Sequence, residues 1–141
     1  RRQRQMCIRD RCGSARNVAI ALQYGAQRIG HGIAAIKDPT LMQACRDAHI
    51  GFELCPTSNF QTKAVTDASS YPLRAFLDFG LLATINTDNR TVSHTTLTDE
   101  YAFALEQLAI KKEDLRTLYK NSVEISFADD SVKHQLLYLL P

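Results

Sequence analysis

Three short polar clusters carry the residues of this chain that could do chemistry. His31 lies between two glycines in R-I-G-H-G, Ser58 and Asn59 close E-L-C-P-T-S-N, and Asp88 and Asn89 close T-I-N-T-D-N. The Asp88 carboxylate can ligate a metal or accept a proton, and the His31 imidazole can exchange protons near neutral pH. The Asn89 amide offers both a donor and an acceptor to a flat heterocycle. Taken alone, however, each cluster could equally be a polar turn, and a lone histidine is more often structural.

Each cluster follows a segment suited to a buried parallel strand. These apolar, partly β-branched segments are residues 28–30, 52–55 and 82–85. An amphipathic segment precedes each strand and ends near Gly25, Gly51 or Gly80. The repeat of helix, glycine, strand and polar cluster predicts βα units around a parallel sheet. In an α/β barrel, the carboxyl ends of the strands carry the chemistry, so the clusters should meet there.

Capping residues and apolar periodicity predict the helices. Ser14 and Asp38 can cap the first two, Pro72 can open the third, and Thr96 with Asp99 resembles a capping box before the fourth. The expected inward-facing residues are Val18, Ala21 and Leu22; Leu41, Ala44, Cys45 and Ala48; Leu73, Phe76 and Leu77; Tyr101, Ala104, Leu105 and Leu108; an unbroken series over 115–127; and Val132, Leu136, Leu137 and Leu140. We expect the helices after the last strand to cover that strand and the bottom of a barrel.

The predicted fold is therefore α/β: a partial TIM (β/α)8 barrel made of the last three βα units plus C-terminal helices. A complete barrel of this kind needs about 250 residues, and the chain has 141. Three strands alone would leave open sheet edges. We expect residues 12–141 to be the C-terminal portion of a larger enzyme.

Composition excludes several classes of protein. A hydrophobic content of 45% with 23% charged residues is typical of a globular protein. The net charge of +2 gives no sign of a nucleic-acid or membrane surface, and no apolar run approaches the roughly 20 residues of a membrane span. Four cysteines without C-x-x-C spacing indicate reduced thiols in a cytoplasmic protein.

The first eleven residues differ from the rest. They contain five arginines and no apolar periodicity. Residues 1–11 resemble translated adapter sequence, and we interpret them as non-native; the alternative is a disordered basic arm. Either way they are excluded from the fold prediction.

The ordered motifs resemble those of the adenosine deaminase family. R-I-G-H-G, E-L-C-P-T-S-N and T-I-N-T-D-N occur in that family's order and at about its spacing, and the resemblance covers about residues 12–141. The later segment R-T-V-S and T-T-L-T-D-E-Y is more similar to adenosine deaminases than to adenine or AMP deaminases. The resemblance implies a zinc-dependent barrel enzyme of purine salvage. Its small-molecule partners would be the substrates adenosine and 2'-deoxyadenosine, which it would deaminate by hydrolysis to inosine (or 2'-deoxyinosine) and ammonia.

The resemblance also implies roles for individual residues. Asp88 would be the aspartate ligand of Zn2+ and could accept the proton of the attacking water. His31 would orient and stabilise the attacking oxygen. Asn89 stands where many members of the family have a second aspartate that hydrogen-bonds the purine N7. Since an unprotonated N7 is an acceptor, an amide that donates without prior protonation suits that position.

Other family motifs do not occur in the sequence. No H-x-H is found, and Ile8–Arg11 fills the place of H-A-G-E, so three zinc ligands and the proton donor of the family pattern have no counterpart. His49, His94 and His134 are expected to be solvated or packing residues. We therefore expect this chain to be inactive alone. An adenine or modified-AMP deaminase, and a non-catalytic interaction module, remain alternatives.

Overall fold

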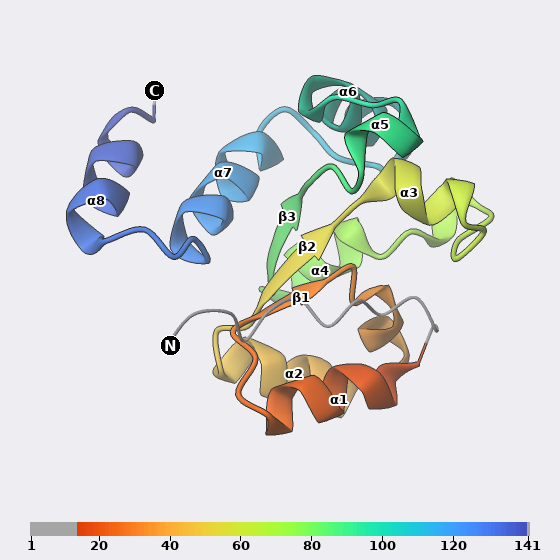
Figure 1. The fold of residues 1–141 in the computed structure, drawn as a ribbon, viewed down its shortest axis with the longest axis horizontal. Coiled ribbons are helices and arrows are strands. Elements are labelled where there is room, and N and C mark those ends of the chain that lie inside the picture. Colours follow the sequence, from red (N-terminus) through yellow and green to blue (C-terminus); the bar gives the residue numbers. More distant parts are fainter. Residues whose placement is uncertain (1–13, 141) are drawn as a thin grey trace.

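A computed structural model describes residues 14–140 of the chain (Figure 1). The predicted separate segment, residues 1–11, lies outside the described residues. In the described part, a sheet of three parallel strands is ordered β1 (Arg28–Gly30), β2 (Gly51–Leu54) and β3 (Leu82–Ile85). The predicted α/β class with a parallel sheet is confirmed, and the sheet is consistent with part of a barrel.

The strands form the centre of the core. Ile29 pairs with Phe52, and Phe52 pairs with Ala83, and all three side chains are buried. The helices follow one another along the chain as α1 (Ala15–Gln23), η1 (Ile33–Lys37), α2 (Pro39–Asp47), α3 (Pro56–Gln61), η2 (Ala68–Ser70), α4 (Leu73–Phe79), α5 (Arg90–Ser93), α6 (Leu97–Gln107), α7 (Asp114–Glu124) and α8 (Asp130–Tyr138). Figure 1 shows α1 and α2 on the β1 side of the sheet and α5 to α7 on the β3 side.

The predicted caps are present. The Ser14 and Asp38 side chains accept the N–H groups of the first turns of α1 and α2. The Thr96 and Asp99 side chains form a reciprocal capping box at the start of α6. Gly80 ends α4 with a φ of 82°, a left-handed conformation that costs glycine least.

The prediction for α2 was wrong in two respects. Ala44 and Ala48 are exposed, while Met42 joins Leu41 and Cys45 in the core. The helix stops at Asp47, and His49, rather than Gly51, takes the left-handed conformation.

Gly51 instead opens β2 and lies against the residue that follows α7. A Cβ added at Gly51 would lie 2.7 Å from Ile125 Cγ2, so only a residue without a side chain fits there. Close packing between β2 and the chain after α7 therefore explains this glycine.

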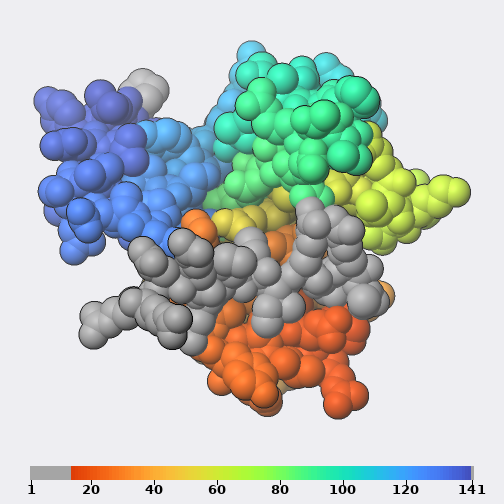
Figure 2. Space-filling model, in the orientation of Figure 1, coloured from red at the N-terminus to blue at the C-terminus, as the bar shows by residue number. Residues whose placement is uncertain are grey.

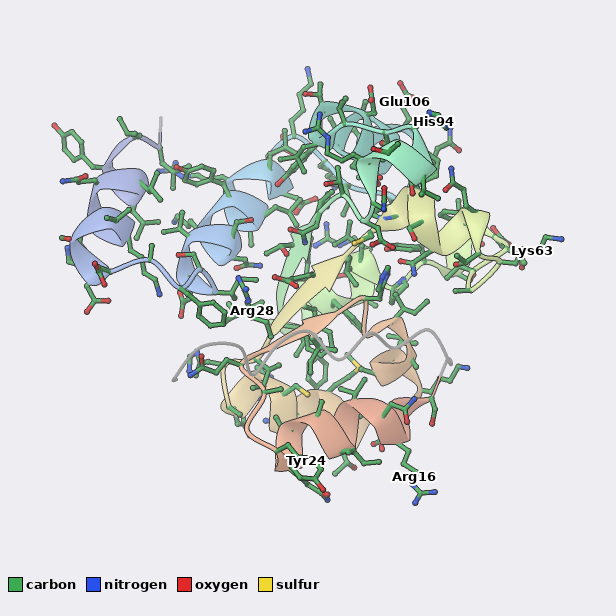
Figure 3. The ribbon with its side chains drawn as sticks, in the orientation of Figure 1. Arg16, Tyr24, Arg28, Lys63, His94 and Glu106 are labelled. Atoms are coloured by element: carbon green, nitrogen blue, oxygen red, sulfur yellow. The ribbon has the colours of Figure 1, made fainter. Side chains whose placement is uncertain are left out.

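The two last helices also depart from the prediction. The apolar series expected to run over 115–127 breaks when α7 ends at Glu124, and the Phe127 ring is 56% exposed. The Arg28 guanidinium, labelled in Figure 3, lies 3.9 Å from the centre of that ring. α7 covers β3 as expected, but α8 packs on α7 and buries none of its residues. Figure 2 shows these helices as a lobe to one side of the sheet and its other helices.

Two further findings bear on the class of protein. No helix in the described residues is both long and apolar enough to cross a membrane.

Cys45 and Cys55 are buried and not disulfide-bonded, and burial raises the pKa of the Cys45 thiol to about 11. Cys45 is therefore an unreactive core residue.

Candidate functional site

His31 lies directly beyond β1 in an unusual backbone conformation. Its φ is 63°, and Gly32 follows with a φ of 61°. The His31 N–H donates to the Glu53 carbonyl at 2.9 Å, so pairing between β1 and β2 extends to this residue. A positive φ is strained for histidine and is found disproportionately at functional sites. The turn leaves the imidazole buried at the carboxyl edge of the sheet.

Asp88 reaches the same edge from the loop after β3. Its Oδ2 lies 3.7 Å from His31 Nε2, and it accepts a hydrogen bond of 2.9 Å from Ser58 Oγ. Ser58 belongs to α3, which follows β2 directly. The ends of three neighbouring strands therefore bring together the imidazole, the hydroxyl and the carboxylate, as the sequence predicts.

A second buried contact holds the other side of the His31 ring. Asn59 Nδ2 lies 3.0 Å from His31 Nδ1, and the Tyr71 hydroxyl donates to Asn59 Oδ1 at 2.9 Å. Burial, with smaller contributions from nearby Cys55 and Glu100, holds the pKa of Tyr71 well above its usual value. The Tyr71 hydroxyl therefore keeps its proton and remains a donor.

A cavity of about 420 Å³ opens at this edge of the sheet. Its lining residues are Gly30, His31, Glu53, Cys55, Asn86, Thr87 and Asp88. The volume lies within the range of small-molecule sites. A larger hollow of about 630 Å³ between α7 and α8 contains neither His31 nor Asp88. We therefore place the candidate site at the smaller cavity, which His31 and Asp88 line.

Asn89 lies next to this cavity but does not line it. It is exposed at the start of α5, and its Oδ1 accepts the Val92 N–H at 3.0 Å. This contact fixes the oxygen toward the helix and leaves the NH2 group on the other side of the amide. The role of Asn89 in substrate binding stays a prediction.

The three other histidines of the chain contribute nothing to this cavity. His49, His94 and His134 are all exposed. His94, labelled in Figure 3, lies at the outer edge of the helices that follow β3. Their predicted role as solvated or packing residues agrees with these positions.

Glu100 supports the site and was not predicted. Its side chain is fully buried in α6, and Oε2 accepts the Thr57 N–H at 3.1 Å. This acceptor satisfies an N–H in the first turn of α3, because Cys55, the residue before the helix, makes no side-chain cap. Within the described residues, Glu100 Oε1 has no hydrogen-bond partner. Its burial could have been predicted from its spacing from Ala104 and Leu108, because residues at that helical spacing lie on one face.

The residues present match part of a zinc centre. Carboxylate and imidazole are both ligand types for zinc, which takes three protein ligands in catalytic sites. However, residues 14–140 contain no group of three or more His, Cys, Asp or Glu side chains arranged to hold a metal. Asp88 and His31 are the two candidate groups of these types that face each other at the cavity.

Solved structures show the same fold. An adenine deaminase from Arthrobacter aurescens superposes with a TM-score of 0.84 and 28% identity over 89% of this chain and 38% of its own. An N6-methyl-AMP deaminase from Arabidopsis thaliana gives 0.72 and 26%, over 88% and 36%. A Burkholderia ambifaria amidohydrolase with bound zinc gives 0.81 at 23% identity, over 89% and 36%, and is similar in fold.

Sequence comparison identifies the family. An adenosine deaminase from Shewanella woodyi is 45% identical over 128 residues, which make up 90% of this chain and 39% of the relative. The chain thus spans about two fifths of the length of that curated relative. Residues 12–140 match the adenosine deaminase family model. The chain belongs to the adenosine deaminase family.

Proposed function

We propose that this chain forms the C-terminal part of the active site of a zinc-dependent adenosine deaminase. The enzyme would hydrolyse the 6-amino group of adenosine and 2'-deoxyadenosine and release ammonia. The observation that carries the proposal is that His31 Nε2 and Asp88 Oδ2 face each other across 3.7 Å beside the cavity at the carboxyl edge of the sheet. The 45% identity to an adenosine deaminase favours adenosine as the substrate.

The proposed role of Asp88 comes from the family resemblance, and its surroundings support it. Asp88 would bind Zn2+ through its carboxylate and accept the proton that the attacking water loses. The bound ion would supply Lewis acidity, which lowers the pKa of water toward neutrality. The Ser58 hydroxyl donates to Oδ2 and thereby restrains the carboxylate. The remaining ligands and the proton donor to the purine would come from outside the described residues.

His31 and Asn89 would act on different parts of the reaction. His31 would orient the attacking oxygen from the side opposite Asp88, since its ring is buried, Asn59 contacts its Nδ1, and its Nε2 faces Asp88. Asn89 would donate its NH2 to the purine N7, because its oxygen is already engaged by the Val92 N–H.

A second candidate substrate class has specific support. The solved structures similar to this chain include an adenine deaminase and an N6-methyl-AMP deaminase, at 28% and 26% identity. Both would use the same site at the strand ends, and the difference would lie in which group accompanies the purine ring. An adenine or N6-methyl-AMP deaminase is therefore the alternative.

A chimera tests the proposal. Residues 14–140 would replace the matching segment of the Shewanella woodyi adenosine deaminase, with the unaltered relative as control. We expect a zinc-containing enzyme whose kcat/KM is highest for adenosine when adenosine, adenine and N6-methyl-AMP are compared. A chimera that folds and binds zinc but deaminates none of them contradicts the proposal. A shift of preference toward adenine, relative to the control, favours the alternative.

Three variants of the chimera assign the roles. Asp88→Ala should lose both zinc and activity. His31→Ala should keep its zinc and lower kcat by about 10²–10³, the usual effect of removing one electrostatic group. Asn89→Ala should raise KM with zinc content unchanged. If His31→Ala loses the metal while Asp88→Ala keeps it, the assigned roles are wrong.

A further inference from the structure

We propose that Asn59 and Tyr71 are positioning residues that hold His31 as the tautomer with its proton on Nε2. This inference deepens the proposed function, because it concerns the residue that would orient the attacking oxygen. It specifies which nitrogen of His31 is the donor and which residues on the other side of the ring determine that choice.

The three side chains form one buried chain of contacts. His31, Asn59 and Tyr71 are 5%, 4% and 5% exposed. Asn59 Nδ2 lies 3.0 Å from His31 Nδ1, and Asn59 Oδ1 lies 2.9 Å from the Tyr71 hydroxyl. The Tyr71 ring stacks on Phe60 at a centroid distance of 5.7 Å, and Phe60 meets Phe103 edge-on. The aromatic contacts therefore fix where the hydroxyl lies.

The direction of the hydrogen bonds follows from the Tyr71 hydroxyl. The Asn59 amide could in principle present either its NH2 or its oxygen to His31. In the described part of the chain, the hydroxyl hydrogen of Tyr71 has Asn59 Oδ1 as its acceptor. Turning the amide over would leave this buried hydrogen without that acceptor, which is unfavourable. Asn59 therefore donates to His31, and His31 Nδ1 must be an acceptor.

The tautomer follows directly. A neutral imidazole carries one N–H and one lone pair, so an acceptor at Nδ1 places the proton on Nε2. Nε2 faces Asp88 Oδ2 at 3.7 Å, which is too long for a direct hydrogen bond. An oxygen atom between the two groups could accept from His31 Nε2 and donate to Asp88. The opposite tautomer would offer that oxygen a lone pair instead of a proton.

The test reads the tautomer by NMR in the full 141-residue chain labelled with 15N-histidine. Spectra are recorded at about pH 8, where an ordinary histidine is neutral. We expect His31 to show a protonated Nε2 and an unprotonated Nδ1, and His31→Gln assigns its signals. The exposed residues His49, His94 and His134 serve as internal references for mixed tautomers.

Two variants should change this result. Tyr71→Phe removes the hydroxyl hydrogen, so the amide can turn over and His31 should become a mixture of tautomers. Asn59→Asp replaces the donor by an acceptor, so Nδ1 should gain a proton. Tyr119→Phe is the matched control, because it removes a hydroxyl that donates to the Leu136 carbonyl between α7 and α8. The His31 signals should not change in that control.

The outcomes separate this inference from the proposed function. A proton on Nδ1 in the unmodified chain, or unchanged His31 signals in both variants, overturns the inference. In the chimera, Asn59→Asp should lower kcat while zinc stays bound. If the NMR results hold but the unmodified chimera deaminates nothing, the tautomer assignment stands and the proposed function fails.

Discussion

At the scale of single residues, the site consists of side chains that hold one another in place. Asp88 is restrained by Ser58, and His31 by Asn59, and both partners come from α3. A short helix directly after β2 thus supplies one support to each of the two groups that we place in the reaction. Loss of such a support should reduce function without removing a ligand.

We predict the effect of Ser58→Ala from this arrangement. In the chimera, the substitution frees the Asp88 carboxylate to rotate, because it removes the 2.9 Å hydrogen bond to Oδ2. Zinc affinity or kcat should fall by about 10- to 100-fold, as for other residues that orient metal ligands. Metal titration and steady-state kinetics measure the two quantities. Ser131→Ala, at an exposed position of α8, is the control, and equal behaviour of the two variants would exclude the proposed role of Ser58.

The sequence indicated the candidate groups at the strand ends better than Tyr71 and Glu100, which support them. His31 and Asp88 were predictable because each follows an apolar strand, and parallel strands bring their carboxyl ends to one edge. Tyr71 was not predictable, because it precedes Pro72 in a polar stretch without periodicity. Its contact with Asn59 depends on how the chain between β2 and α4 packs. Glu100 was missed because a charged residue within an apolar helix face is ordinarily placed in solvent.

At the scale of elements, close contacts between segments distant in sequence determine several boundaries. Strand β3 was predicted with its correct bounds from an apolar run between a glycine and polar residues. Helix α3 was not, since Pro56 to Asn59 has the composition of a turn. Its first turn is stabilised by Glu100, which lies 43 residues further along the chain. Local sequence carries no information on such a partner.

Gly51→Ala tests the contact between β2 and the end of α7. The new methyl group would lie 2.7–2.8 Å from three atoms of Ile125, including its Cβ, so the backbone must move. We expect a loss of about 1–3 kcal/mol in the free energy of unfolding, as in other overpacked cores. Chemical denaturation measures it. In the double variant with Ile125→Ala, the two losses should not add; strictly additive losses would show that the two residues do not compete for space.

An ion pair that joins α4 to α7 should make stability depend on pH. Partial burial pushes the pKa of Asp114 upward, but the Lys111 N–H and the Arg74 guanidinium outweigh it and hold the pKa below its ordinary 3.8. Arg74 Nη1 lies 2.7 Å from Asp114 Oδ2. A carboxyl group whose pKa is lowered by folding stabilises the protein above its unfolded pKa, and this contribution disappears as pH falls through the folded pKa.

The measurement compares the unfolding free energy of the chain with that of Asp114→Asn. The difference in unfolding free energy should have its full value near pH 7. It should shrink as pH falls below about 4, where the carboxyl group of the unfolded chain becomes protonated. In the Arg74→Gln background, the effect of Asp114→Asn at pH 7 should be smaller. A difference that grows toward acid pH would show that the pKa of Asp114 is raised by folding.

At the scale of the whole molecule, the chain corresponds to only part of the length of its relatives. It spans 39% of the Shewanella woodyi relative, and its described residues form a sheet of three strands. The apolar residues Val132 and Leu137 of α8 are each 41% exposed. The predicted helix is present, but its apolar residues are not buried as expected, because no pattern within one helix specifies what covers it.

The last prediction concerns metal binding by the chain alone. Catalytic zinc needs at least three protein ligands, and residues 14–140 provide no group of three candidate side chains. The purified 141-residue chain should therefore lose added zinc during gel filtration and convert no adenosine to inosine above a zinc-free control. The chimera, treated identically, should retain about one zinc per chain, because the relative supplies the ligands that the family pattern places before residue 12. Stoichiometric zinc with deaminase activity in the isolated chain would require a metal site other than the one proposed. Zinc retained by the isolated chain and lost in Asp88→Ala, without activity, would show that Asp88 binds metal before the other ligands are present.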